Sequence, residues 1–254
     1  MKATITTVLI LGMMGLAITT ATAATVTDNF ATSHDYLTSG VAGTIWSGVL
    51  NAGGAQAMNT TTTPGALTVS VATGRQWGWG VWNAPMLYID AVGDFEANVT
   101  VTDSGKGINW WKASLMAYVD NGNIMQIQLI SPVDYDRTNG ANWQDGAAVG
   151  AGEGGGEGNY WTPFAQMKMV RTVDSFQMYV RHNDTETWTT YGFGPMVRND
   201  LNGVPVKIGL SFETADGAAS SAHFDNFSLT TVPEPAGMLL LGCGGLLTLY
   251  RRRK

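Results

Sequence analysis

The sequence predicts an all-β protein, an antiparallel β-sandwich flanked by an N-terminal signal helix and a C-terminal single transmembrane helix. Three observations lead to this prediction. Residues 24–231 contain many short segments of alternating apolar and polar residues, separated by turns rich in Gly and Asn. No segment of this body has a convincing helical period. Each terminus carries an apolar segment beside basic residues, which separates 1–23 and 232–254 from the body.

The first 23 residues have the order of a secretory signal peptide. Lys2 gives a minimal positive start, residues 8–18 are apolar, and Ala21-Thr22-Ala23 has the small residues of a cleavage site. An uncleaved anchor is the alternative, disfavoured because the apolar region is short. We therefore predict that the body is exported.

The clearest strand of the body covers residues 94–102. Its odd-numbered positions are apolar and its even-numbered positions are polar, as in a half-buried antiparallel strand. Residues 112–119 and 124–130 form a predicted hairpin around Asn121-Gly122. The other predicted strands are 25–30, 66–72, 77–82, 86–89, 167–173, 176–181, 188–191, 204–213 and 222–230.

Two long segments are predicted to be irregular. Residues 36–54 are loop-like, with Trp46 as a buried point, and a shorter Thr-rich polar turn is predicted at 58–64. Residues 131–164 read as an exposed loop with a Gly-rich run at 146–158. That run lacks the Gly-Lys-Ser/Thr ending of a phosphate-binding loop, so we interpret it as a flexible connection.

Charge and cysteine content exclude several classes of partner and architecture. Residues 24–231 hold nine basic and 19 acidic residues, a formal charge of about −10. Such a surface argues against nucleic acid and anionic lipid as partners. The single cysteine, Cys243, lies in the C-terminal apolar segment, so no disulfide framework is available to the body.

The late strands resemble those of concanavalin A-like (laminin-G-like) jelly-roll domains. The resemblance rests on Arg171, a turn and residues 176–180, then Trp188, and on 206–210 followed by 223–227. It implies a jelly roll whose terminal strands lie side by side.

An Asp-Asn-Phe triplet occurs near each end of the body, at Asp28 and at Asp225. If the terminal strands are neighbours, these carboxylates could supply oxygen ligands to a structural calcium ion. Alternatively each Asp accepts local amide N–H groups. We favour the second interpretation and predict no required cofactor.

The last 23 residues resemble the PEP-CTERM sorting signal. Pro233, Glu234 and Pro235 precede the apolar run 236–250, and Arg251, Arg252, Arg253 and Lys254 follow it. The resemblance implies recognition and cleavage by exosortase, a membrane protease, in a bacterium that makes exopolysaccharide. The protein would be anchored transiently in the inner membrane and then reach the cell envelope or the extracellular space. A plain membrane anchor is the alternative, because a 15-residue helix rises about 22 Å against a bilayer core of about 30 Å.

Clustered tryptophans suggest carbohydrate binding, because an indole face stacks on the C–H face of a sugar. The competing interpretation is packing in the core, which we favour for Trp46 and Trp188. The candidate stacking residues are Trp77, Trp79, Trp110, Trp111, Trp143 and Trp161.

Catalysis is the less favoured alternative. The jelly roll hosts glycoside hydrolases and lyases, and hydrolysis needs two carboxylates about 5–10 Å apart. Members of that fold with the retaining mechanism carry a Glu-x-Asp-x-x-Glu type of cluster. The nearest approach to it here is Asp94-Phe95-Glu96, which lacks the third carboxylate. Fold alone licenses no activity. We therefore expect a non-catalytic carbohydrate-binding or structural module associated with exopolysaccharide.

Overall fold

The computed structural model describes residues 23–72, 77–78, 81–103, 111–131, 137–145, 147–148, 164–190, 195–214 and 219–232. The predicted signal helix and transmembrane helix, with the sorting residues from Pro233 onward, lie outside these ranges. Across the described residues, no helix is long and apolar enough to span a bilayer.

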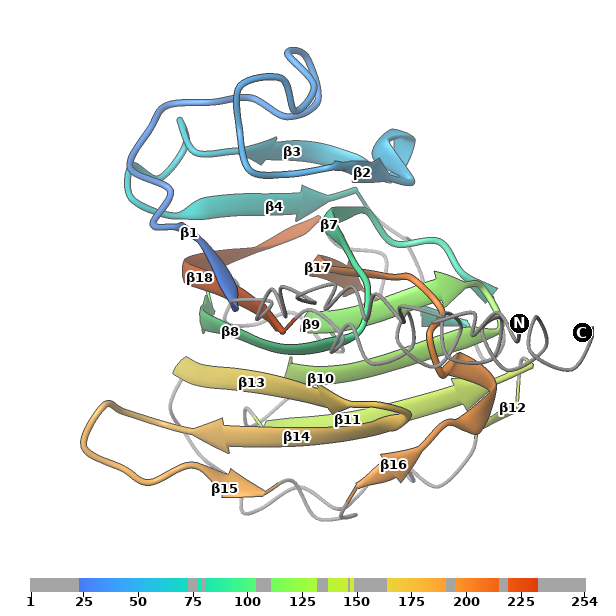
Figure 1. The fold of residues 1–254 in the computed structure, drawn as a ribbon. Coiled ribbons are helices and arrows are strands. Elements are labelled where there is room, and N and C mark those ends of the chain that lie inside the picture. The colour runs from blue at the N-terminus through green and yellow to red at the C-terminus, as the bar shows by residue number, and fades with distance from the viewer. Residues whose placement is uncertain are drawn as a thin grey trace, which may run out of the picture. The chain divides into compact units, whose positions relative to one another are not determined.

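Two antiparallel sheets form a β-sandwich (Figure 1), as the alternating pattern predicts. The strand order of sheet A is β15 (Thr189–Thr190), β14 (Ser175–Arg181), β13 (Phe164–Thr172), β8 (Asp94–Asp103), β18 (Ser220–Val232), β4 (Leu67–Val71) and β3 (Ala55–Asn59). Two further strands pair outside this order: β1 (Ala24–Asp28) with β18, and β16 (Met196–Val197) with β14.

Sheet B faces sheet A across the core. Its order is β12 (Ala147–Ala148), β11 (Arg137–Gln144), β10 (Asn123–Ser131), β9 (Trp111–Asp120), β17 (Val206–Thr214), β7 (Met86–Ala91) and β2 (Gly48–Leu50). A separate pair is formed by β5 (Trp77–Gly78) and β6 (Val81–Trp82). The helical structure among the described residues is limited to the 3-10 turns η1 (Ala52–Gly54) and η2 (Asn199–Leu201).

The core is built by the period-2 alternation of the strands. Phe95, Ala97, Val99 and Val101 on β8 are each at most 2% exposed, whereas Glu96 is exposed on the other face. Apolar residues of β9, β10 and β17 meet them from sheet B in one core cluster. The predictions for residues 66–72, 94–102 and the 112–130 hairpin are confirmed.

Three local predictions are wrong. The strand predicted at 77–82 is two short strands that pair with each other, Trp77 opposite Trp82. The loop predicted at 131–164 contains β11, which continues sheet B beside β10 through residues 137–143. The turn predicted at 58–64 begins inside β3. β11 and β3 lack a clean apolar alternation, because a sheet edge is stabilised by backbone pairing that the side-chain pattern does not report.

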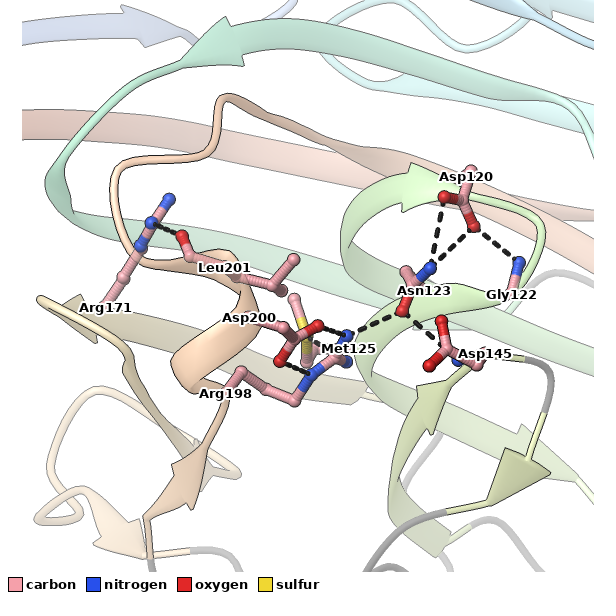
Figure 2. A network of polar contacts seen from close by, with 9 residues as sticks. All are labelled: Asp120, Gly122, Asn123, Met125, Asp145, Arg171, Arg198, Asp200 and Leu201. Carbon is pink, nitrogen blue, oxygen red and sulfur yellow. Dashed lines mark hydrogen bonds and ion pairs between the residues drawn. The ribbon is translucent and has the colours of Figure 1, made fainter.

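Two buried arginines hold η2 against the ends of the sandwich, as Figure 2 shows. Arg198 is 1% exposed and donates to both carboxylate oxygens of Asp200, at 2.9 and 2.7 Å. Its Nη2 also donates to Asn123 Oδ1 at 2.7 Å, which ties η2 to the first residue of β10. Asn123 in turn is held by Asp120 in the hairpin turn, at 3.0 Å.

Arg171, at the end of β13, clamps the other side of η2. Its guanidinium donates to the backbone carbonyls of Val173, Leu201 and Val204, and it lies 5.4 Å from the Phe176 ring centroid. A charged group that is 1% exposed is stable only when its donors are satisfied, and these carbonyls satisfy them. Arg171, which belongs to the sequence pattern of the jelly-roll resemblance, therefore anchors η2 and the residues after it.

Replacing Arg198 by Ala should lower the free energy of unfolding by about 2–3 kcal/mol, because it strands Asn123 and Asp200 beside a cavity. Urea unfolding measures the change. The matched control is Arg181→Ala, which breaks an ion pair to an 81% exposed Asp184 and should cost less than about 1 kcal/mol. Equal losses for the two variants would contradict the clamp.

The Arg198 contribution should also depend on pH. Hydrogen bonds from Arg198 lower the pKa of Asp200 below its ordinary 3.8. A carboxyl whose pKa is lower in the folded than in the unfolded protein stabilises the fold at pH values above its unfolded-state pKa. That stabilisation is lost as the pH falls through its folded-state pKa. The free energy of unfolding, measured as a function of pH, should therefore differ between wild type and Arg198→Ala by a constant amount at neutral pH and by less below about pH 4. A difference that stays constant down to about pH 2 would argue against the pairing of Arg198 with Asp200.

Candidate functional site

A cleft of about 720 Å³ opens where β1, the loop after it and β18 meet. Its volume falls within the usual range for small-molecule sites, about 300–1,000 Å³. Asn226 and Ser228 of β18 line one side, and Asp28, His34 and Thr44 line the other. The cleft exists because β1 pairs with β18 from Ala24–Thr231 to Asp28–Phe227, so the chain leaves the sheet beside the β18 backbone. The resemblance-based prediction that the terminal strands are neighbours is confirmed.

A β-bulge shapes the β18 side of the cleft. The register of β18 against β8 shifts between Asp225 and Ser228, and Asn226 within the shift has a φ of 52°. Asp225 stabilises this backbone by accepting from the Asn226 N–H at 2.6 Å and from its side-chain Nδ2 at 2.9 Å. Bulges and left-handed non-glycine residues cost energy and concentrate at functional sites. Here they present an exposed amide at the rim of the cleft.

Asp28 organises the opposite side. Its Oδ1 accepts from the Phe30 N–H at 2.7 Å, where Phe30 has a φ of 53°, and its Oδ2 accepts from Trp46 Nε1 at 2.9 Å. Trp46 is 4% exposed and its ring lies 4.7 Å from that of Phe227, centroid to centroid. The predicted core position of Trp46 is confirmed, and it forms the support beneath the cleft.

Tyr36 and His34 line the cleft next to Asp28. Burial raises the pKa of Tyr36, and the neighbouring Asp28 carboxylate raises it further, so the phenol keeps its proton. The His34 ring lies 4.6 Å from that of Tyr36 and its Nε2 donates to the Gly40 carbonyl at 2.8 Å. Because a carbonyl only accepts, this bond assigns the proton to Nε2. The cleft therefore combines carboxyl oxygens, aromatic rings and N–H and O–H donors.

The Asp-Asn-Phe triplets at the two ends are the sequence signal for this site. The structure places them next to each other, with Asp28 opposite Phe227 in the register. Asp28 Oδ1 and both Asp225 oxygens accept local N–H groups, whereas Asp28 Oδ2 accepts from the indole of Trp46, 18 residues along the chain. Within the described ranges, no three His, Cys, Asp or Glu side chains are grouped to hold a metal ion. Asp225 thus has the contacts of the local-amide interpretation, and Asp28 combines one local contact with one to Trp46.

Of the tryptophans predicted to stack on sugars, Trp111 is the one whose side chain the structure describes, and it does not line this cleft. Trp111 is 1% exposed in the core cluster, where its ring lies 6.0 Å from that of Phe212, so it presents no face to a ligand. For Trp77 and Trp143 the structure describes backbone positions only, in β5 and opposite Ile124 in β11. Trp79, Trp110 and Trp161 lie outside the described residues.

The core position predicted for Trp188 is wrong, the reverse of the error at Trp111. The sequence predicts a core residue, but the side chain is only half-buried. It lies before the two-residue edge strand β15, with Lys168 and Arg181 against its ring. Aromatic residues at a sheet edge are stabilised by such cation–π contacts as well as by burial, and hydrophobicity alone does not distinguish the two.

A second polar group lies on the face of sheet B that points away from the core cluster. Glu213 of β17 is 3% exposed and pairs in register with Lys112 of β9, which is 4% exposed. Burial raises the pKa of Glu213, partly offset by Lys112. Sequence reasoning missed this pair because its members are distant in the chain and each follows an ordinary alternating pattern.

Comparisons with known proteins match the fold. No family model matches the sequence, and no curated protein does. The GH43 protein BlXynB from Bacillus licheniformis is similar with a TM-score of 0.58 and 15% identity over 81% of this chain and 39% of that one. A xylan β-1,4-xylosidase from Bacillus halodurans C-125 is similar with a TM-score of 0.57 and 11% identity, over 80% of this chain and 38% of that one.

A functionally unknown protein from Saccharomyces cerevisiae is also similar, with a TM-score of 0.54 and 14% identity over 66% of this chain and 89% of that chain. The present chain thus spans about two fifths of the length of the two bacterial proteins and nearly all of the yeast protein. At these identities the likeness establishes a shared all-β sandwich.

Replacing Trp46 by Phe should destabilise the cleft while keeping its apolar packing. The variant leaves Asp28 Oδ2 without the indole donor, so we expect a loss of about 1–3 kcal/mol in the free energy of unfolding. Denaturant unfolding measures it. Trp188→Phe is the control, since no hydrogen bond of Trp188 is present among the described residues; a smaller loss at Trp46 than at Trp188 would refute the role given to Asp28.

Proposed function

We propose that this protein is an exported, non-catalytic carbohydrate-binding module with a concanavalin A-like jelly roll. The observation that carries the proposal is the cleft beside β1 and β18. A sugar presents many hydroxyl groups, each both donor and acceptor. The cleft offers hydroxyls at Thr44 and Ser228, an amide at Asn226 and a carboxylate at Asp28, together with aromatic edges.

The architecture supports the same proposal. β1 pairs with β18 at every one of its five residues, so the cleft residues Thr27, Asp28 and Ser228 are held in place before the ligand arrives, which lowers the entropy cost of binding. The sandwich is similar to chains that include a xylan β-1,4-xylosidase. That likeness concerns the fold, and it makes polysaccharide the natural ligand class to test first.

Export and sorting are part of the proposal and rest on the two terminal segments. A signal peptide at 1–23 would deliver the chain to the exterior of the inner membrane, and residues 232–254 would present Pro233-Glu234-Pro235 to exosortase. The body would then be left in the cell envelope or the extracellular matrix, with exopolysaccharide or matrix components as partners.

A polysaccharide hydrolase or lyase is the second candidate, and Glu213 is the observation that favours it. A buried carboxyl with a raised pKa is suited to general acid catalysis. The partner in register is Lys112, whereas hydrolysis needs a second carboxylate. Release of reducing ends from polysaccharide that is lost in Glu213→Gln would favour the enzyme over the binding module.

Asn226→Gly tests the cleft directly. Glycine accepts a φ of 52° without strain and removes only the side-chain amide, so the fold should persist while affinity for the bound glycan falls about tenfold. Isothermal titration with glycans selected from an array measures the change.

Asn51→Gly is the matched control for this test. Asn51 is also an exposed asparagine with a positive φ, 51°, and it also donates one side-chain hydrogen bond, but it lies away from the cleft. Its affinity should match that of wild type. Equal affinities for Asn226→Gly and wild type would rule out the cleft as the binding site.

Deleting residues 232–254 should release the body from its sorting route. Fractionation of cells expressing the full and truncated chains should find the truncated protein in the soluble exported fraction and the full chain in the envelope or matrix. Identical distribution of the two chains would show that the C-terminal segment is not a sorting signal.

A further inference from the structure

A line of polar side chains crosses the outer face of sheet A and ends at the cleft. In register across neighbouring strands lie Tyr179 of β14, Lys168 of β13, Asn98 of β8, Ser228 of β18 and Thr27 of β1. Ser228 and Thr27 line the cleft, and Asn98 Nδ2 donates to Ser228 Oγ at 3.4 Å. Neighbouring strands are about 4.8 Å apart, so the line from Tyr179 to Ser228 is about 14 Å long.

Lys168 is the charged residue of this line, and aromatic rings fix its position. Its Nζ lies 4.7 Å from the centroid of the Tyr179 ring and 4.7 Å from that of Trp188. The side chain is half-buried, and its neighbours Met167 and Met169 point into the core. An ammonium held between two rings loses conformational freedom before any ligand binds.

Within the part of the chain that the structure describes, the N–H donors of Lys168 make no hydrogen bond. An ammonium has three N–H donors, and a ring face attracts the charge without accepting a conventional hydrogen bond. Among the described residues no oxygen accepts from Lys168 Nζ and no carboxylate forms an ion pair with it. Arg181, the other cation at Trp188, differs, because Asp184 pairs with it at 2.9 Å.

We propose that this line is an extension of the cleft and binds an acidic polysaccharide, with Lys168 pairing with the carboxylate of a uronic acid unit. The inference rests on the proposed carbohydrate-binding function. The polymer runs from the cleft past Asn98 to the fixed ammonium beside Trp188. Asn98 Nδ2 donates to Glu96 Oε1 at 3.2 Å and to Ser228 Oγ at 3.4 Å, so its side-chain oxygen is the atom that would accept from sugar hydroxyl groups.

Charge gives the reason for a dedicated cation. The exported body carries about −10, so a polyanion is repelled over most of its surface. One preorganised ammonium on the binding face supplies a local attraction that selects acidic over neutral polymers. It acts at contact distance and is weakened by salt.

The test compares polygalacturonate with fully methyl-esterified polygalacturonan, which has the same backbone without the charge. The full-length protein should bind polygalacturonate about tenfold more tightly than the methyl ester at low salt, which corresponds to about 1.4 kcal/mol for one charge-assisted contact. Lys168→Met keeps the apolar stem and removes the ammonium. It should abolish the preference for the acid and leave binding to the ester unchanged.

Lys207→Met is the matched control. Lys207 also lies over a tyrosine, 4.8 Å from the Tyr88 ring, but it belongs to sheet B and already pairs with Asp90 at 2.9 Å. Its variant should keep the full preference for the acid.

Three outcomes would overturn the inference. Equal wild-type affinity for acid and ester would remove the selectivity while leaving carbohydrate binding in place. Equal loss of preference in both lysine variants would assign it to general surface charge. Binding of dextran sulfate as tight as that of polygalacturonate would indicate an unspecific polyanion site. Binding of no polysaccharide at all would reject the proposed function itself.

Discussion

The pairing of β18 is the constraint on which the rest of sheet A depends. This 13-residue strand pairs with β8 along one side and with β4 and then β1 along the other, so it joins the C-terminal end of the body to its first strands. Such contacts between distant parts of the chain carry a high loop-closure cost, which only a large buried surface offsets. Phe224, Phe227 and Leu229 of β18 supply part of that surface, each at most 1% exposed.

The bulge in β18 connects this strand pairing to the cleft. A regular strand would keep alternating through Asp225, Asn226 and Phe227, whereas the register shift places Asn226 at the rim and returns Phe227 to the core against Trp46. At the other side of the fold, Arg171 and Arg198 fix η2 (Figure 2), so the strands β13 and β14 that carry Lys168 and Tyr179 end in an anchored loop. These hydrogen bonds connect the end of β13 and the start of β10 to η2 and the residues after it.

Much of the sandwich could be predicted because the alternation of apolar and polar residues in a half-buried strand shows which of its faces is buried. β4, β8, β9 and β10 each follow the apolar alternation that was read from residues 66–130. The aromatic residues were harder. Trp111 and Trp188 have the same side chain, yet one is in the core and the other is half-buried beside two cations, because burial is set by the partner sheet and the strand's position within it.

By itself the sequence determined the all-β class, the main hairpin and the acidic character of the body, because alternation, Asn-Gly turns and charge are local properties. It also indicated the two matching Asp-Asn-Phe triplets, without their geometry. Only the tertiary structure decided that these triplets form a cleft, that Glu213 faces Lys112, and that Lys168 lies in line with Ser228. Those relations join residues more than 50 positions apart, and they arise from strand register across a sheet, which no local pattern encodes.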